Sequence, residues 1–292
     1  MSVKRNFALG IMIGLLAVHV GYAQTTIVGP AKGSLVVVGG NMQDERIVKR
    51  IIELAGGPDE LIVIIPTAGG GSDYDQHPSG LRQWKAAGAK NLFVLHTYDH
   101  NVADTEKFVE PLKKASGVFF EGGRQWRLAD AYLNTRTHRE LQALLDRGGV
   151  IGGSSAGATI IGSFMVRGDT KGNEVMLGDH QVGLGFLKNV AVYQHVLKRN
   201  RQFDMLDVIK VHPELLGIAI DEDTAIVVQG DQFDVMGKSY ALIYDNQRQI
   251  SPIGLFYFLT VGDRYNMATR EATRPTQTMQ PIERIKKSPW SK

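Results

Sequence analysis

The stretch Val150-Ile151-Gly152-Gly153-Ser154-Ser155-Ala156-Gly157-Ala158 decides the fold of this 292-residue chain. It predicts a short apolar strand, a glycine-flanked serine and the small residues that open a helix. Residues 153–157 match G-x-S-x-G, the nucleophile elbow, with Ser155 at the centre. Such a turn strains the backbone of the central serine, so its neighbours must be nearly free of side chains. The pattern therefore predicts a hydroxyl held clear of a sheet edge, with backbone N–H groups nearby to bind an oxyanion.

Apolar runs alternate with amphipathic segments on the amino-terminal side of Ser155. Strands are predicted at 35–38, 61–65, 92–95, 117–120 and 150–151, with helical segments between them, the first over 44–54. Near-continuous apolar strands that alternate with helices predict an α/β fold with a mostly parallel sheet covered on both faces.

The pattern changes after Gly168. Short, closely spaced strands are predicted at 216–220, 225–228, 233–235 and 240–244, and they indicate an antiparallel extension of the same sheet. We expect one domain over 24–268, with two domains as the alternative, and a polar tail over 269–292.

The first 23 residues have the pattern of an export signal. Lys4 and Arg5 precede an apolar run over 7–20, and Gly21-Tyr22-Ala23 supplies small residues at a cleavage site. Cleavage there predicts a periplasmic or secreted protein that begins at Gln24. An uncleaved anchor is the alternative, but the run is shorter than the roughly 20 residues of a membrane span.

Composition excludes several classes of protein. The chain has no cysteine, so disulfides and a lipoprotein anchor are excluded. Without Lys4 and Arg5 the 33 basic residues fall to 31, against 30 acidic ones, and this balance argues against a nucleic-acid partner. No later run is apolar for long enough to cross a bilayer, so no membrane contact is expected after signal cleavage.

Polar, glycine-rich turns follow several predicted parallel strands, at 39–41, 67–71, 121–125 and around Ser155. Binding sites in open α/β sheets lie at the carboxyl ends of the strands, so these turns converge on one edge. That convergence favours a catalytic Ser155 over a simple tight turn, which is the alternative explanation of the glycines.

A serine hydroxyl needs a base to take its proton, usually a histidine that a carboxylate orients. His195 ends an apolar strand over 190–194 and is the best candidate for the base. Glu222 follows the strand at 216–220 and is the favoured acid. Asp221 and Asp223 are its alternatives, because three acids in a row cannot be separated by spacing alone.

Two loop clusters contain residue types that ligate metals. One holds Asp73, Asp75 and His77, and the other holds His96, Asp99 and His100. Loop histidines are more often polar surface residues than ligands, so we predict no metal and no other cofactor.

Four segments resemble the cyanophycinase and dipeptidase E family of serine peptidases. Residues 152–158 are similar to its G-G-[TS]-S-A-G-A signature, and 120–125 (F-E-G-G-R-Q) to its F-x-G-G-x-Q loop. Tyr193-Gln194-His195 is similar to its D-Q-H segment, and 217–225 to G-I-G-I-D-E-x-T-A. The segments occur in the family's order, and the last two favour the cyanophycinase branch.

The resemblance implies a flavodoxin-like fold related to class I glutamine amidotransferases, with serine in place of their cysteine, and a possible homodimer. It implies Ser155 as nucleophile, His195 as general base and Glu222 as the orienting acid. The oxyanion hole would be formed by the N–H groups of Gly123 and Ala156. The positions associated with substrate binding are Gln125, Gln194 and Arg201.

Four residues depart from the family pattern around the pocket. Tyr193 stands in place of an aspartate, Asp204 near an expected arginine, Asp223 in place of a frequent asparagine, and Arg124 where asparagine or aspartate is common. Cyanophycin is a polyaspartate that carries arginine on its β-carboxyls. These departures would redistribute the charge of the pocket and with it the β-aspartyl-arginine specificity.

The leading hypothesis is an exported serine peptidase that hydrolyses peptide or β-aspartyl-type isopeptide bonds through an acyl-enzyme. An exopeptidase for acidic dipeptides is the second, with Arg124 and Arg201 binding a carboxylate. A catalytically silent binding protein that uses the same cleft is the third.

Overall fold

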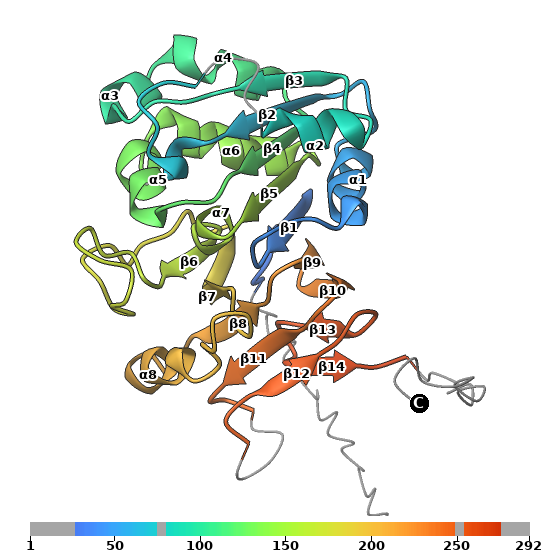
Figure 1. Cartoon of the computed structure of the whole chain (residues 1–292), viewed down its shortest axis with the longest axis vertical. Coiled ribbons are helices and arrows are strands. Elements are labelled where there is room, and N and C mark those ends of the chain that lie inside the picture. Colours follow the sequence, from blue (N-terminus) through green and yellow to red (C-terminus); the bar gives the residue numbers. More distant parts are fainter. Residues whose placement is uncertain (1–26, 75–79, 249–253, 276–292) are drawn as a thin grey trace, which may run out of the picture.

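The computed structural model describes residues 27–74, 80–248 and 254–275. The predicted export signal therefore lies outside the described residues, as does most of the expected tail. Within these ranges two β-sheets lie side by side, flanked by helices (Figure 1).

The larger sheet contains nine strands within the described ranges, in the order β14-β13-β10-β9-β1-β5-β4-β2-β3. Strands β1 to β5 run parallel, and β9, β10, β13 and β14 continue the sheet in antiparallel pairs. The bounds are β1 Ser34–Val38, β2 Leu61–Ile65, β3 Asn91–Val94, β4 Gly117–Phe120, β5 Val150–Ser154, β9 Thr224–Gln229, β10 Gln232–Gly237, β13 Arg264–Asn266 and β14 Glu271–Thr273.

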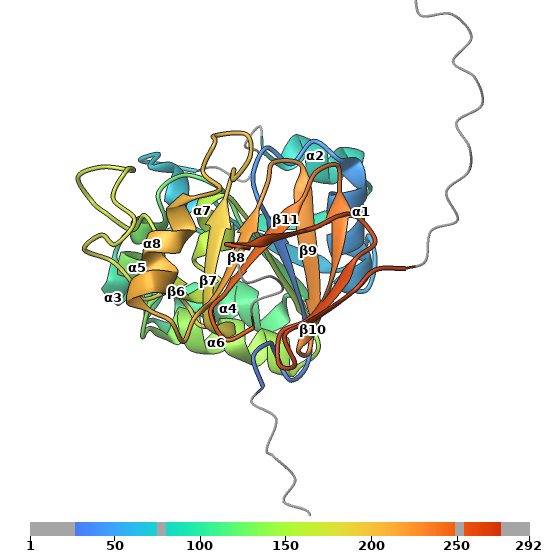
Figure 2. The same cartoon turned by 90° about the horizontal axis from the view of Figure 1, so that it is seen from below.

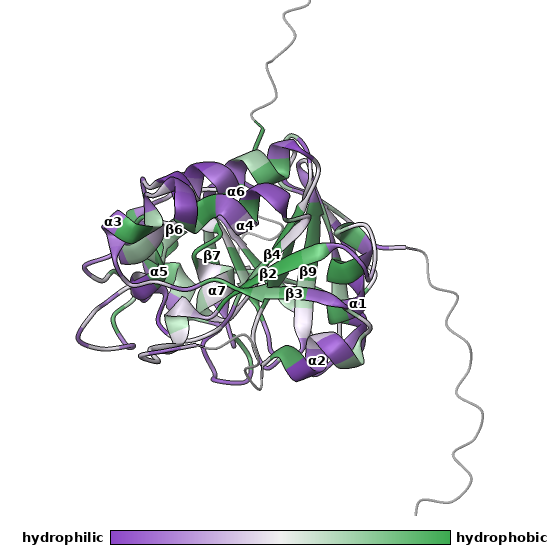
Figure 3. Cartoon of the chain, turned by 90° about the horizontal axis from the view of Figure 1, so that it is seen from above, coloured by the Kyte–Doolittle hydropathy of each residue, from purple (hydrophilic) through white to green (hydrophobic). Residues whose placement is uncertain are grey.

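Helices cover both faces of the parallel part, because successive side chains of a strand point to opposite faces. Val36 and Val38 of β1 pack with α1 and α2, whereas Leu35 and Val37 share a core with α4 and α6. Figure 3 shows apolar strands between helices whose outer faces are polar. The helical bounds are α1 Glu45–Leu54, η1 Thr67–Gly69, α2 Leu81–Ala86, α3 His100–Ala103, α4 Glu106–Lys114, α5 Gln125–Tyr132, α6 Arg136–Asp146, α7 Ala156–Thr159 and α8 Asp204–Val211.

The smaller sheet has the order β12-β11-β8-β7-β6 within the described residues. Its bounds are β6 Gly162–Met165, β7 Leu187–Gln194, β8 Leu216–Ile220, β11 Ala241–Asp245 and β12 Tyr257–Leu259. Val190, Val192 and Ile218 pack into the core shared with the larger sheet, while Tyr193 and Tyr244 face the core formed with α8. Figure 2 shows α8 beside β6, β7 and β8.

The structure confirms the predicted α/β fold with a mostly parallel sheet and an antiparallel C-terminal extension. The assignment of all four later strands to one sheet is wrong in part, since β8 pairs in parallel with β7 and β11 pairs with β8. Both strands are apolar on both faces, so their composition reports burial and not which strand lies next to them. No helix of the described residues is long and apolar enough to cross a membrane.

The larger sheet also extends into the segment for which the sequence predicts a tail. Strand β14 pairs with β13, and Arg274 forms an ion pair with the buried Asp263 at 2.6 Å. The short polar strand has no apolar periodicity, which is why the composition of this segment favoured a tail.

Candidate active site

Ser155 lies in a strained turn between β5 and α7, at the carboxyl edge of the larger sheet. Its φ of 56° and ψ of −113° are unusual for a residue with a side chain. The turn depends on the glycines beside it: a methyl group at Gly153 would overlap the carbonyl oxygen of Gly157, and one at Gly157 would overlap that of Phe120. The nucleophile-elbow pattern therefore marks a backbone conformation that only these small residues permit.

A chain of two hydrogen bonds joins Ser155 to residues of the smaller sheet. The Ser155 Oγ lies 2.9 Å from Nε2 of His195, and Nδ1 of His195 lies 2.7 Å from Oε1 of Glu222. His195 follows β7 and Glu222 follows β8, two neighbouring parallel strands, so both side chains leave the same edge. The structure thus brings together all three residues for which the sequence predicts catalytic roles.

The protonation state of His195 follows from its surroundings. Burial lowers the pKa of His195, and the hydrogen bond to Glu222 raises it by less, so the pKa lies below its ordinary value of 6.5. The imidazole is therefore neutral near pH 7. With Nδ1–H donated to the carboxylate, Nε2 keeps a lone pair that accepts the Ser155 hydroxyl proton. This arrangement suits proton transfer from serine to histidine.

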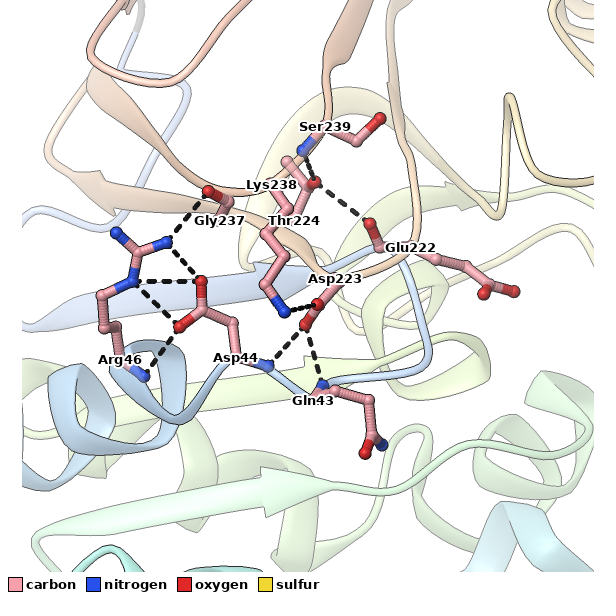
Figure 4. A network of polar contacts seen from close by, with 9 residues as sticks. All are labelled: Gln43, Asp44, Arg46, Glu222, Asp223, Thr224, Gly237, Lys238 and Ser239. Carbon is pink, nitrogen blue, oxygen red and sulfur yellow. Dashed lines mark hydrogen bonds and ion pairs between the residues drawn. The ribbon is translucent and has the colours of Figure 1, made fainter. Parts of the chain in front are cut away.

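Asp223, the acid that follows Glu222, holds the surrounding loops (Figure 4). Asp223 accepts hydrogen bonds from the backbone N–H groups of Gln43 and Asp44, at 2.8 and 2.5 Å, and pairs with Lys238. Figure 4 shows the Glu222 side chain directed away from this network. The carboxylate bonded to His195 is therefore that of Glu222.

Asp221 holds the loop that follows His195. It accepts from the N–H groups of Leu197 and Lys198, at 3.1 and 2.9 Å, and from the hydroxyl of Ser239 at 2.7 Å. The alternatives that the sequence left open are separated here, because the carboxylates of Asp221 and Asp223 are occupied by backbone and side-chain donors.

Gly40 is a site residue that the sequence reasoning did not single out. Its φ is +128°, and a methyl group there would overlap the His195 ring, lying 2.6 Å from Nδ1 and 2.8 Å from Nε2. The N–H of His195 donates to the carbonyl of Gly39 at 2.9 Å, so the end of β1 forms a wall against the imidazole. The pair Gly39-Gly40 at a strand end was the available signal, but only the structure shows which side chain requires it.

The loop after β4 lies against Ser155 on another side. A methyl group at Gly122 would lie 3.3 Å from Cβ and 3.8 Å from Oγ of Ser155. Gly123 has a φ of +144°, which favours glycine, and a methyl group there would overlap the Ala68 carbonyl. Within the described part of the chain the N–H groups of Gly123 and Ala156 donate no hydrogen bond, which leaves both for a ligand.

Arg124 and Gln125, two predicted substrate-binding residues, bind the loop that follows β6. Arg124 donates to the carbonyls of Asp169 and Gly172, and Gln125 donates from Nε2 to those of Val166 and Arg167, at 2.7 and 2.9 Å. Their donors thereby position this loop, and a contact of either residue with substrate stays a prediction.

Tyr193 and Asp204, two of the four departures from the family pattern, contact each other. The Tyr193 hydroxyl donates to Asp204 at 2.7 Å and accepts from Nε of Arg167 at 2.7 Å, and Arg167 pairs with Asp204 at 2.6 Å. Tyr193 is fully buried, and Arg167 is 4% exposed. Arg167 therefore neutralises the charge of Asp204 within the fold, and the Tyr193 hydroxyl hydrogen-bonds both partners of this ion pair.

Gln194 and Arg201 lie beside this cluster and contact each other at 3.4 Å. Both are buried, and burial lowers the pKa of Arg201. Arg201 forms no ion pair within the described ranges; its guanidinium lies over the Tyr193 ring, 5.8 Å from the ring centre. Substrate binding by these residues and by Asp223 stays a prediction.

The histidines of the second loop cluster have other partners. His96 hydrogen-bonds Thr67 at 2.9 Å and packs against Tyr74 and Tyr98, while His100 donates to the carbonyl of Asp130. Asp75 and His77 lie outside the described residues. In the part of the chain that is described, no group of three or more His, Asp or Glu side chains is gathered as metal ligands would be.

Known proteins resemble this chain over most of its length. The model of Peptidase family S51 matches residues 35–236. A cyanophycinase from Geminocystis herdmanii (strain PCC 6308) is 33% identical over 263 residues, which cover 82% of this chain and 96% of that protein. A peptidase E from Pasteurella multocida (strain Pm70) is 24% identical over 207 residues, covering 68% of this chain and 85% of that protein.

A solved structure has the same fold. A peptidase from an acI-B1 Actinobacterium aligns with a TM-score of 0.61 and 25% identity, covering 84% of this chain and 99% of that one. The match of the family model to more than half of the chain confirms the family that the four sequence segments predicted. The chain belongs to peptidase family S51, in the cyanophycinase and dipeptidase E family, and is a serine-type peptidase.

Proposed function

We propose that this peptidase hydrolyses peptide or isopeptide bonds through a Ser155–His195–Glu222 triad and an acyl-enzyme. The observation that carries the proposal is the hydrogen-bond chain from Ser155 Oγ through the imidazole to Glu222, with contacts of 2.9 and 2.7 Å. The first length lies within the range at which a nucleophile gives its proton to a base, and the second is that of a hydrogen bond by which the carboxylate orients the imidazole.

The reaction has two halves. Ser155 Oγ attacks the carbonyl carbon while Nε2 of His195 takes its proton, and the N–H groups of Gly123 and Ala156 bind the oxyanion. The imidazolium then protonates the leaving amine, which departs. In the second half, water gives a proton to His195 and attacks the acyl-enzyme, which releases the acid and restores the serine.

The proposed substrate is a β-aspartyl-type isopeptide. Its support is the 33% identity to a cyanophycinase over nearly the whole of that protein. The mutual contacts of Tyr193 and Asp204 are consistent with a pocket whose charge is arranged differently from the family pattern.

One observation favours a second candidate, the cleavage of acidic dipeptides. Arg201 lies six residues after His195, is buried, and has no carboxylate partner within the described residues. A substrate carboxylate would supply the missing charge. A panel of α- and β-aspartyl dipeptides, incubated beside cyanophycin, separates the two candidates by the products that form.

Export is a separate part of the proposal. We infer that residues 1–23 are removed and that the mature protein, periplasmic or secreted, begins at Gln24. Amino-terminal sequencing of the protein recovered from periplasm and medium tests this. A recovered chain that still begins at Met1 would contradict it.

Ser155→Ala tests the mechanism. The variant is expected to lose about 10⁴-fold or more in kcat, while its melting temperature stays close to that of the parent. Ser116→Ala is the matched control, because Ser116 precedes β4 at the opposite edge of the same sheet. A fluorophosphonate that failed to label Ser155 in folded protein would favour a silent binding protein instead.

A further inference from the structure

A pocket of about 270 Å³ opens next to Ser155, and the proposed chemistry does not use it. Its lining includes Gln43 from the loop after β1, Gln83 from α2, Phe119 and Glu121 from the end of β4, and Ser154 from β5. Ser154 precedes the nucleophile, and Gly122, which also lines the pocket, lies against the Ser155 side chain. A substrate bound at Ser155 would therefore place a neighbouring group at the mouth of this pocket.

Glu121 is the charged residue of the lining, and its carboxylate has no partner. No hydrogen bond or ion pair joins it to another group within the described residues. Burial raises the pKa of Glu121, and no positive charge among the described residues offsets the effect. Glu121 is half-buried, and a carboxylate partly withdrawn from water without a partner is unfavourable, so a cation that entered the pocket would relieve that cost.

Two amides complete a set of acceptors around this carboxylate. The side chains of Gln43 and Gln83 make no hydrogen bond within the described part of the chain, so their oxygens are free to accept. Figure 4 shows the Gln43 amide directed away from Asp223, which holds the backbone of Gln43 in place. The pocket thus presents a carboxylate and two side-chain amides that have no hydrogen-bond partner among the described residues.

We propose that Glu121 is a specificity-determining residue that binds a cationic side chain of the substrate, carried by a residue next to the scissile bond. The inference rests on the proposed function, because it names the group that the same site recognises. A guanidinium offers five N–H donors and an ammonium three, and both match a carboxylate flanked by amide oxygens.

Kinetics with matched substrate pairs test the proposal. Each pair has an arginine or its neutral isostere citrulline, or a lysine or norleucine, beside the scissile bond, in peptide and β-aspartyl form. The parent enzyme is expected to favour the cationic member by about tenfold to a hundredfold in kcat/KM, and Glu121→Gln is expected to bring the ratio close to one. The arginine and lysine arms identify which cation is preferred.

Glu110→Gln is the matched control, because Glu110 is exposed on α4, on the other face of the sheet. It is expected to keep the ratio of the parent. Equal ratios in parent and Glu121→Gln would overturn the proposal. An equal loss on both members of every pair, with unchanged labelling of Ser155 by a fluorophosphonate, would also overturn it and assign Glu121 to the support of the Gly122–Gly123 loop.

A binding measurement separates this inference from the proposed function. Calorimetry on Ser155→Ala protein with arginine amide and citrulline amide is expected to show tighter binding of the cation, and Ser155→Ala/Glu121→Gln is expected to lose the difference. If the parent cleaves no peptide but the difference is present, the proposed function fails and the cation pocket stands. If the parent cleaves both members of each pair equally and the difference is absent, the cation pocket fails and the function stands.

Discussion

The two sheets contribute to the site in different ways. The larger sheet supplies Ser155 and the Gly122–Gly123 loop, which depend on backbone conformations that a single methyl group would disturb. The smaller sheet supplies His195 and Glu222, whose positions depend on side-chain hydrogen bonds. Activity should therefore be sensitive to added side-chain bulk in the half of the site that the larger sheet supplies. In the half that the smaller sheet supplies, it should be sensitive to the removal of a carboxylate.

Among substitutions of the residues that the smaller sheet supplies, the largest effect is expected from Glu222→Gln, which leaves the shape of the side chain nearly unchanged. The amide is nearly isosteric, but it cannot stabilise an imidazolium and favours the wrong tautomer of His195. We expect kcat to fall by about 10³- to 10⁴-fold at an unchanged melting temperature. Asp221→Asn, which alters a neighbouring acid, should retain most of the activity; an equal loss in that variant would contradict the assignment of Glu222.

The parent enzyme and the Glu222→Gln variant should differ in the pH dependence of kcat/KM. Because the pKa of His195 lies below 6.5, the parent should keep half of its kcat/KM at a pH below 6.5. The Glu222 carboxylate raises that pKa, so its removal should move the acid limb of the residual activity to lower pH. A limb that stays in place would show that Glu222 is not the charge that His195 senses.

Gly40→Ala tests the place where the two halves meet. The added methyl group would overlap the imidazole and displace it from both Ser155 and Glu222. We expect activity to fall by about 100-fold, since small misplacements of a catalytic group have effects of that size. The positive φ adds a stability loss of about 1–2 kcal/mol.

Gly88→Ala is the control that separates the strain of a positive φ from the overlap with the imidazole of His195. Gly88 has a φ of +107°, but a methyl group there would meet nothing within 4 Å. Gly88→Ala should be destabilised about as much as Gly40→Ala but should keep full activity. Thermal unfolding and kcat/KM measure the two quantities. Equal losses of activity in both variants would show that Gly40 acts through stability alone.

Asp221→Ala removes a support of the smaller sheet's half. Two N–H groups and a hydroxyl would lose their acceptor, and we expect the free energy of unfolding to fall by about 2–3 kcal/mol. Asp221→Asn keeps an oxygen toward Leu197 and Lys198, so it should restore most of that stability. Denaturant unfolding of the two variants measures the difference, and no rescue by Asn would indicate that the charge itself is required.

The difference between the halves also explains what could be predicted from sequence. Strands β1 to β5 lie within a few residues of their predicted bounds, because all five contain apolar runs and β1, β2, β4 and β5 are buried on both faces. Ser155 and its glycines form a contiguous motif. His195 and Glu222 are far apart in the chain, but each follows an apolar strand, which placed them at the same edge.

The rest depended on contacts that leave no local pattern. Arg124 and Gln125 bind backbone carbonyls of the loop after β6, and any residue type supplies such a carbonyl. The choice of Glu222 over its two neighbours required knowing which loops lie beside them. Strand β6 was missed because its sequence Gly-Ser-Phe-Met contains no apolar run.

The smallest effect is expected from Tyr193→Phe, which tests whether a family departure belongs to the substrate pocket or to the fold. The change removes the hydroxyl from between Arg167 and Asp204, but their direct ion pair of 2.6 Å remains. We expect the free energy of unfolding to fall by about 1–2 kcal/mol, because a lost buried hydrogen bond has an effect of that size. We expect kcat/KM to change by less than about threefold. Unfolding and kinetics on the same preparations measure both quantities.

A tenfold change in kcat/KM at unchanged stability would instead place the hydroxyl against the substrate. The smaller sheet would then contribute specificity as well as the base and its acid.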